Sequence, residues 1–256
     1  MMRDTSFTTK SAKEIIRRMA FRIVRASDPI TLFHSSHYLR HTARRLEHLA
    51  SLKVPVAGMS VLEVGAGIGD HSHYYIDRGC KITITEPRPE NLAHLRNRYP
   101  GGDIRFLDMD APSALDGAPF DVVHCYGLLY HLNNPQLALE FLSQHTGGML
   151  FLETCVSFGQ DEAVNLVGES RSSATQAVSG TGCRPTRPWL YAHLKTLFEF
   201  VYLPTTQPCH EEFPLDWTAP KKHNAGLQRA IFIASRRSLD TPELTSTLSS
   251  HQLRQA

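Results

Sequence analysis

Residues 61–70 read VLEVGAGIGD, an apolar run that passes directly into three glycines at alternate positions, Gly65, Gly67 and Gly69. Glycine lets the backbone turn sharply and approach a ligand closely. A helix that starts after such a loop points its free N–H groups and its positive dipole end at the same place. In an open α/β sheet that place is the crevice at the carboxyl ends of the strands, so the sequence predicts a cofactor there.

From Ser60 onward, short apolar runs alternate with helical segments, which is typical of parallel βαβ units. Strands are predicted over 61–64, 81–85, 104–107, 121–125, 149–154, 198–203 and 230–235, and helices over 71–78, 89–98, 135–144 and 189–197. Pro89 and Pro135 suit a first helical turn, where the missing N–H has no partner to lose. Gly147-Gly148 is expected to break the chain before the fifth strand.

Two helices are predicted ahead of this pattern. Ser11 and Glu14 form a capping box for an amphipathic helix that ends near Arg25. Three arginines, Arg18, Arg22 and Arg25, line its polar side, either as a solvated face or as a contact for an anionic partner such as a phosphate or a membrane surface. The second helix covers 37–52, with a predicted common face of Leu39, Ala43, Leu46 and Ala50.

These patterns divide the chain into a helical cap over 1–55, a central domain over 56–236 and a polar tail over 237–256 that is expected to fray. Within the central domain, residues 157–188 carry no clear period and form a long insertion after the fifth strand. Long ordered loops in compact domains are usually functional. We therefore expect the cap and the insertion to lie over the crevice as a lid.

Acidic residues follow the second and third predicted strands. Glu86 comes 17 residues after Gly69, where a carboxylate can accept hydrogen bonds from both hydroxyls of a ribose. Asp110-Ala111 follows the third strand, where a carboxylate can meet an exocyclic amine. The fourth strand runs into 125–132, CYGLLYHL, at the mouth of the same crevice.

Together these motifs resemble the class I S-adenosylmethionine (SAM) dependent methyltransferases, over roughly residues 55–155. The resemblance implies a Rossmann-like fold with a seven-stranded, mostly parallel sheet, and SAM as cofactor. Glu86 then binds the ribose and Asp110 the adenine amine, with Asp108 as a competitor. The full set of implied cofactor contacts is Glu63, Gly65, Ala66, Gly67, Gly69, Glu86, Asp110, Ala111, Cys125 and Tyr126. A dinucleotide-binding dehydrogenase is disfavoured, because its G-x-G-x-x-G places the third glycine one residue later.

His131 is the leading candidate for a catalytic group. The SAM sulfonium is a good leaving group, so the protein mainly supplies proximity, but an oxygen nucleophile often also needs a general base. Imidazole titrates near neutral pH, and His131 follows the fourth strand. Alternatively, His131 caps the following turn or packs against substrate. Weaker candidates are His34, His37, Glu153 and His210.

A second candidate site is the segment 182–189, GCRPTRPW. Its two arginines, Arg184 and Arg187, are stiffened by prolines, and guanidinium groups suit carboxylate or phosphate. With Trp189 and Tyr130 they are the predicted acceptor-binding residues. The alternative is that they clamp the long insertion to the domain.

Composition limits the partners only loosely. The net charge is +2, but residues 1–60 hold eleven Lys/Arg against four Asp/Glu. The five scattered cysteines and the absence of an apolar run of membrane length favour a cytoplasmic protein. We expect no metal site, because no His or Cys pair has a convincing ligand spacing. The expected acceptor is a small molecule or glycan-like compound, methylated on oxygen. RNA or tRNA methylation and a SAM-binding regulatory subunit remain alternatives.

Overall fold

The computed structural model describes residues 28–173, 175–223 and 225–255. Its main sheet has eight strands in the order β11-β8-β10-β5-β4-β1-β2-β3. Five of them are mutually parallel: β1 (Ser60–Val64), β2 (Lys81–Glu86), β3 (Asp103–Phe106), β4 (Phe120–Tyr126) and β5 (Thr146–Cys155). β10 (Arg229–Ser235) runs antiparallel between β5 and β8 (Phe200–Pro204). This is the predicted Rossmann-like, mostly parallel sheet.

The eighth strand departs from the predicted count of seven. It is β11 (Leu244–Thr245), a short strand that pairs antiparallel with the edge of β8. The polar C-terminal segment was expected to fray, and this expectation is wrong. A second pair, β9 (Thr206–Gln207) with β12 (Leu253–Arg254), fixes its far end. Gln252 is buried there and bonds the indole of Trp217 at 2.9 Å and the side chain of Gln207.

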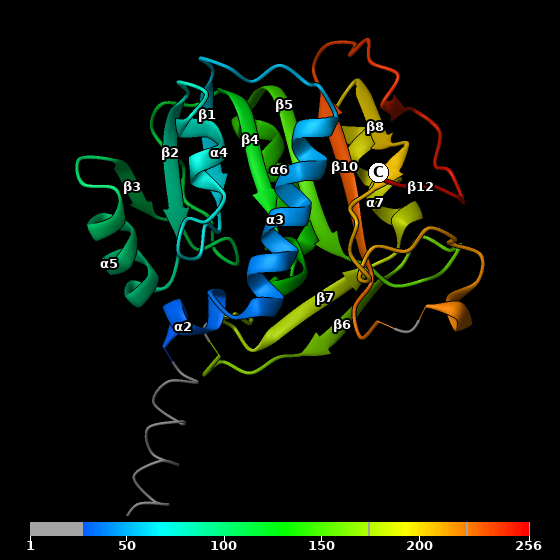
Figure 1. Ribbon diagram of the computed structural model, residues 1–256, viewed down its shortest axis with the longest axis horizontal. Coiled ribbons are helices and arrows are strands. Elements are labelled where there is room, and N and C mark those ends of the chain that lie inside the picture. The colour runs from blue at the N-terminus through cyan, green and yellow to red at the C-terminus, as the bar shows by residue number, and fades with distance from the viewer. Residues whose placement is uncertain (1–27, 174, 224, 256) are drawn as a thin grey trace, which may run out of the picture.

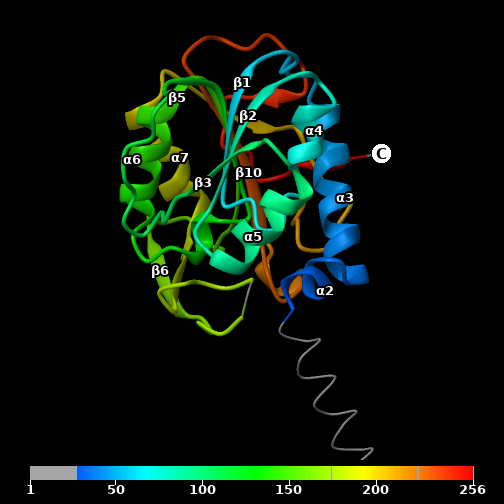
Figure 2. The ribbon, with the colours of Figure 1, turned by 90° about the vertical axis from the view of Figure 1, so that its left-hand side faces the viewer.

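Helices cover both faces of the sheet (Figure 2). α6 (Pro135–His145) and α7 (Arg187–Leu197) lie on one face, and α3 (Ser36–Ser51) and α4 (Ser72–Ile76) lie on the other. α5 (Pro89–Arg98) packs beside β2 and β3. Pro89 and Pro135 open their helices as predicted, and the side chain of Asn134 caps α6 by accepting from the Leu137 N–H at 3.1 Å.

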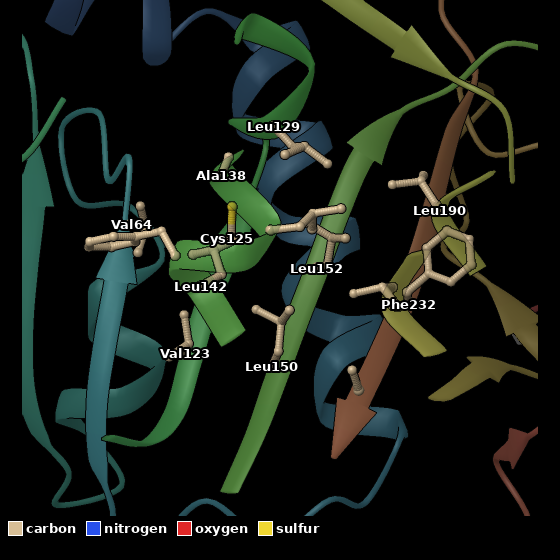
Figure 3. Packing of buried hydrophobic residues seen from close by; sticks show 14 of the residues in the cluster. Val64, Val123, Cys125, Leu129, Ala138, Leu142, Leu150, Leu152, Leu190 and Phe232 are labelled. Carbon is tan, nitrogen blue, oxygen red and sulfur yellow. The ribbon is translucent and has the colours of Figure 1, made fainter. Parts of the chain in front are cut away.

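The core forms one apolar layer on each side of the sheet. The layer under α6 and α7 is shown in Figure 3, where Cys125 lies among Ala138, Leu142 and Leu152. The expected chain break at Gly147-Gly148 is wrong, because both residues lie inside β5. A Cβ on Gly148 would lie 2.4 Å from the Asp121 carbonyl oxygen, so this glycine allows the close approach of β4.

The predicted second helix exists as α3, but its predicted apolar face is wrong. Leu39 is 48% exposed, while the buried positions are His41, Arg45, His48 and Leu49. The reason is that α3 packs over polar groups as well as apolar ones. Arg45 reaches a buried carboxylate on β5, and the His48 ring lies 3.0 Å from the Thr206 carbonyl oxygen. The first predicted helix lies outside the described residues.

The insertion contains a hairpin that sequence patterns did not predict. β6 (Val164–Gly168) pairs antiparallel with β7 (Thr181–Pro185). Figure 1 shows this hairpin and the short helix α2 (Pro29–Phe33) at the same end of the sheet. Within the described parts of the chain, no helix is long and apolar enough to cross a lipid bilayer.

Candidate active site

The glycine loop after β1 is held in a form that requires glycine at three places. Gly65, Gly67 and Gly69 have φ values of +72°, +59° and +83°, in the left-handed region that side chains disfavour. A Cβ on Gly67 would lie 3.1 Å from the Phe33 ring of α2. The N–H of Gly67 donates to Glu86 Oε2 at 2.9 Å, so the loop is fixed to the end of β2.

Glu86 joins the loop to the start of α5. Its other oxygen, Oε1, accepts from the Arg88 N–H and from the Asn91 side-chain amide, both at 3.1 Å. Burial raises the pKa of the Glu86 carboxyl above its usual value, although these hydrogen bonds and Arg88 favour the charged form. Glu86 is therefore held in a fixed position at the carboxyl end of β2.

The two candidate aspartates after β3 both face the same cavity. Asp110 Oδ1 accepts from the Asn133 N–H at 3.0 Å, and Asp108 Oδ1 accepts from the Asp110 N–H at 3.0 Å. In each aspartate this hydrogen bond uses only one of the two carboxylate oxygens, Oδ1. Ala111 is exposed and lies outside the cavity lining, so of the predicted pair only the aspartate reaches the cavity.

One large cavity joins these groups to the rest of the site. Its volume is about 1110 Å³, counting space open to solvent. α2 and α3 supply one wall through Phe33, Tyr38, His41, Thr42 and Arg45, and the insertion supplies another through 175–178. The Arg88 guanidinium donates to the Gln176 carbonyl oxygen at 2.8 Å and so ties the insertion to the start of α5. The cap and the insertion therefore meet the same cavity from opposite sides.

His131 lies in this cavity, in the short helix η1 (Leu129–His131), with a carboxylate behind it. Its Nδ1 pairs with Glu169 Oε2 from the hairpin. Burial lowers the pKa of His131, and Glu169 partly offsets this. Burial favours a raised pKa for the Glu169 carboxyl, but His131, the Ala177 N–H and Arg184 hold it below its usual value. With Nδ1 engaged, only Nε2 remains to accept a proton.

Beside His131 lies a buried network of arginines and carboxylates. Glu153 Oε2 accepts from Arg45 and its Oε1 accepts from Arg229, both at 3.0 Å. Arg229 also donates to Glu212 at 2.6 Å and to the Tyr130 hydroxyl at 3.2 Å. Burial opposes ionisation of Glu153, but the two guanidinium groups outweigh it and lower the pKa of this carboxyl. The network sets the position of Tyr130 and Arg45 in the cavity wall.

Several predicted site residues do not line the cavity. Gly69 packs against Leu95 and Tyr99, and Cys125 points into the core on the α6 side, where burial raises the pKa of its thiol to about 12. Arg187 lies under the Trp217 ring, and its Nη2 donates to the Ser249 carbonyl oxygen at 2.9 Å. Trp189 stacks on His193 at the surface of α7. These side chains have structural contacts, as the clamp alternative expects for Arg187.

Arg184 occupies an intermediate position. It lies outside the cavity lining, yet it donates to the Tyr130 carbonyl oxygen at 2.9 Å and to Glu169 at 3.1 Å. Its guanidinium lies 5.0 Å from the Tyr130 ring centroid. Arg184 thus holds Tyr130, which lines the cavity beside His131, and Glu169, which pairs with His131.

The sequence analysis missed several cavity residues, namely His41, Thr42, Arg45, His71, Asn91, His124, 175–178 and Arg229, and the partner Glu169. Most of them come from α3, the insertion and β10, which carry no motif of their own, while His71, Asn91 and His124 belong to the start of α4, to α5 and to β4. The only available signal was the charge of Arg229 and Glu153 inside otherwise apolar strands, which requires a buried partner.

Comparison with protein families identifies the central part of the chain. Residues 62–148 match the family described as Methyltransferase domain. A tRNA U34 carboxymethyltransferase of Alteromonas mediterranea is 33% identical over 134 residues, 48% of this chain and 39% of that protein. A ubiquinone biosynthesis O-methyltransferase of Xylella fastidiosa is 31% identical over 116 residues, 43% of this chain and 47% of that protein. The chain thus matches less than half the length of these curated relatives.

Solved structures agree on the fold. The N-terminal domain of EvdMO1, crystallised in the presence of SAH and D-fucose, superposes with a TM-score of 0.60 at 19% identity and covers 77% of this chain and 83% of that one. A Burkholderia thailandensis 1,6-didemethyltoxoflavin-N1-methyltransferase, with its acceptor and S-adenosylhomocysteine bound, has a TM-score of 0.52 at 20% identity and covers 92% and 94%. Both likenesses support the Rossmann-like fold described above.

Proposed function

Since residues 62–148 form a class I, Rossmann-like methyltransferase domain, we propose that the chain is a SAM-dependent methyltransferase that methylates an oxygen of a small-molecule or glycan-like acceptor. One observation carries this proposal. A single cavity connects the glycine loop and Glu86 with the pair formed by His131 and Glu169. A nucleotide-type cofactor and a hydroxyl acceptor can therefore meet in one cavity.

The cofactor residues of the proposal lie at the ends of β1, β2 and β3. Glu86, which accepts from the Gly67 N–H, would also accept hydrogen bonds from the ribose hydroxyls, and Asp110 or Asp108 would accept from the adenine amine. Glu63, at the end of β1, is buried, and burial raises the pKa of its carboxyl to about 7. SAM would supply an activated methyl group on a sulfonium, so these residues mainly need to bind and orient.

His131 acts as the general base in this proposal. Its Nε2 would take the proton from the acceptor hydroxyl that receives the methyl group, and Glu169 would orient the ring and stabilise the imidazolium. A lowered pKa keeps His131 neutral at pH 7, which is the form that can accept a proton. Tyr130 and Arg45 form the adjoining wall against which the acceptor rests.

A small acceptor is supported by how the cavity is covered. α2, α3 and residues 175–178 all contribute to its lining, and the Arg88–Gln176 hydrogen bond closes one side. Small-molecule sites are typically enclosed spaces of about 300–1,000 Å³. The five free cysteines fit a reducing compartment such as the cytoplasm.

RNA methylation is the second candidate function. It is favoured by the similarity to tRNA U34 carboxymethyltransferases and by the excess of Lys/Arg over Asp/Glu in residues 1–60. Polyanion binding by such a segment would weaken steeply with salt. Methyl transfer to a small molecule at a rate that does not depend on salt concentration would exclude RNA as the acceptor.

The test is methyl transfer from methyl-labelled SAM, measured first with pools of sugar and phenolic acceptors and separately with total tRNA. Label that enters small hydroxyl compounds, and stays there after ribonuclease treatment, supports the proposal. Label that enters tRNA alone overturns the acceptor class. SAH binding without transfer to either pool would leave a SAM-binding regulatory subunit.

A further inference from the structure

A group of metal-ligand residues lies behind the cavity wall, between α3 and the loop after β9. It consists of His37, His41, His210 and Glu212, called here the α3 cluster. His37 and His41 are one helical turn apart on α3, so their rings lie on the same face. His210 and Glu212 come from a loop that follows more than 150 residues later in the chain, which explains why no local spacing predicted this group.

The buried members of the cluster have ring nitrogens without hydrogen-bond partners. His41 and His210 are both almost fully buried. Neither ring nitrogen of His41, nor Nε2 of His210, has a partner among the described residues. His210 Nδ1 lies 3.3 Å from the Glu212 N–H, and coordination of a metal through Nε2 selects the tautomer that carries its proton on Nδ1, in place of this long contact. Buried polar atoms of this kind normally have a partner, so their convergence points to a ligand.

The spacing of these atoms matches a coordination shell better than a hydrogen-bond network. His37 Nε2 lies 3.6 Å from Glu212 Oε1, and His41 Nε2 lies 3.8 Å from Glu212 Oε2. The ligand atoms of His41, His210 and Glu212 all lie within 4.8 Å of one another. Zn–N and Zn–O bonds of about 2.0–2.1 Å at tetrahedral angles place neighbouring ligand atoms about 3.4 Å apart. The distances from Glu212 to His37 and to His41 are close to this spacing.

The charges around the cluster select the type of metal. Glu212 and Glu153 are balanced by Arg229 and Arg45, so the cluster has no net negative field to attract Mg²⁺ or Ca²⁺. Burial, together with Arg45 and Arg229, holds the pKa of His41 far below its ordinary value. A neutral imidazole is the form that binds a metal. Imidazole-rich sites of this kind suit zinc and its neighbours in the first transition row.

A second group, Glu63, His71 and His124, is closer to the glycine loop and makes a weaker case. Its histidines already have partners. His71 Nδ1 lies 3.2 Å from His124 Nε2, and the Tyr75 hydroxyl lies 2.9 Å from His124 Nδ1. Glu63 is bonded to the Ser72 hydroxyl. Only His71 Nε2 lacks a partner among the described residues, so this group offers one free ring nitrogen where the α3 cluster offers three.

We propose that His37, His41, His210 and Glu212 bind one zinc-type divalent ion that joins α3 to the 208–212 loop. Four protein ligands close the shell, so the ion holds structure and does not meet the acceptor. Arg229, which bonds Glu212, acts as an outer partner that orients the carboxylate. Because α3 supplies His41, Thr42 and Arg45 to the cavity, the ion would also fix that wall. The inference does not depend on methyl transfer.

The test is zinc binding by the full chain after dialysis against a chelator, measured by competition with a chromogenic chelator and by the thermal midpoint. Wild type should bind one equivalent of Zn²⁺ and melt at a higher temperature when it is bound. Cobalt(II) in place of zinc should give the strong visible absorption of a tetrahedral site. His41→Ala should weaken binding more than about 100-fold, since losing even an outer partner typically costs 10–100-fold.

Two further variants keep the result decisive. The His37 side chain is 53% exposed, so the His37→Ala variant should fold normally. Its zinc binding should nevertheless be much weaker than that of wild type. His251→Ala, at an exposed histidine of the C-terminal segment, is the matched control and should bind like wild type. The proposal is overturned if wild type binds no zinc, if His37→Ala and His41→Ala bind as tightly as the control, or if only His124→Ala loses the ion.

Discussion

The two ends of the cavity are built in different ways. The proposed cofactor end, formed by Glu63, the glycine loop, Glu86 and the aspartates after β3, comes from one run of about 50 residues and uses backbone N–H groups and carboxylates at strand ends. The proposed acceptor end, formed by Arg45, Tyr130, His131, Glu169 and Arg229, comes from α3, η1, the hairpin and β10. Local backbone geometry makes the first end, while only the packing of distant segments makes the second.

The largest expected effect is at the cofactor end, in Gly67→Ala. The substitution puts a side chain at φ +59°, where left-handed backbone costs about 1–2 kcal/mol, and places a Cβ 3.1 Å from Phe33. We expect calorimetry to detect no SAM binding. Gly79→Ala is the matched control, because Gly79 has φ +70° and no atom near its Cβ position. Wild-type affinity in a folded Gly67→Ala protein would show that the loop does not carry the cofactor.

At the acceptor end, His131→Ala should lower kcat by about 10²–10⁴-fold, the usual contribution of a general base. SAM affinity should hardly change, because the cofactor residues lie at the other end. The wild-type rate should rise with pH as His131 loses its proton, with a midpoint below 6.5 because burial lowers its pKa. This limb should vanish in the variant. An unchanged rate and pH profile would remove His131 from the mechanism.

A smaller effect, about 10–100-fold in kcat, is expected for Glu169→Gln, since an orienting partner contributes less than the base itself. Glu169 raises the pKa of His131, so its neutralisation should move the acid limb to still lower pH. A purely structural role would lower the rate without moving the limb. Glu162→Gln, at an exposed carboxylate of the same insertion, is the control for the pH–rate measurement.

Glu86→Gln should weaken SAM binding about tenfold, because a charged hydrogen bond contributes roughly 1.5–3 kcal/mol. Glutamine is preferable to alanine here, since Glu86 also accepts from Gly67, Arg88 and Asn91 and its loss would disturb the loop. Titration calorimetry measures the change, with the exposed Glu90→Gln as control. Equal affinities for variant and wild type would place the ribose elsewhere.

The smallest effect separates the two aspartates. Asp110→Ala should reduce SAM affinity less than tenfold, and Asp108→Ala should reduce it less again. Both carboxylates face the cavity, so their difference depends on which one meets the adenine amine. Competition with adenosine measures both variants on one scale. The reverse order would assign the adenine contact to Asp108.

The sequence predicted the parallel strands and their helices closely. Each predicted strand from β1 to β5 overlaps an observed one, because a buried strand between two helical layers has to be apolar and short. For α3, in contrast, the predicted buried face contained Leu39 and its helical neighbours, whereas in the structure His41 and Arg45 are buried. Amphipathic patterns assume that polar residues face solvent, and a buried ion network reverses that rule.

By itself, the sequence determined the cofactor end, because a glycine loop between a strand and a helix has few possible backbone forms and each places its N–H groups at one point. Only the tertiary structure decided the acceptor end. The pairing of His131 with Glu169 spans 38 residues, and that of Arg45 with Glu153 spans 108. Such contacts depend on how whole elements pack, since no local pattern specifies which buried charge will meet its partner.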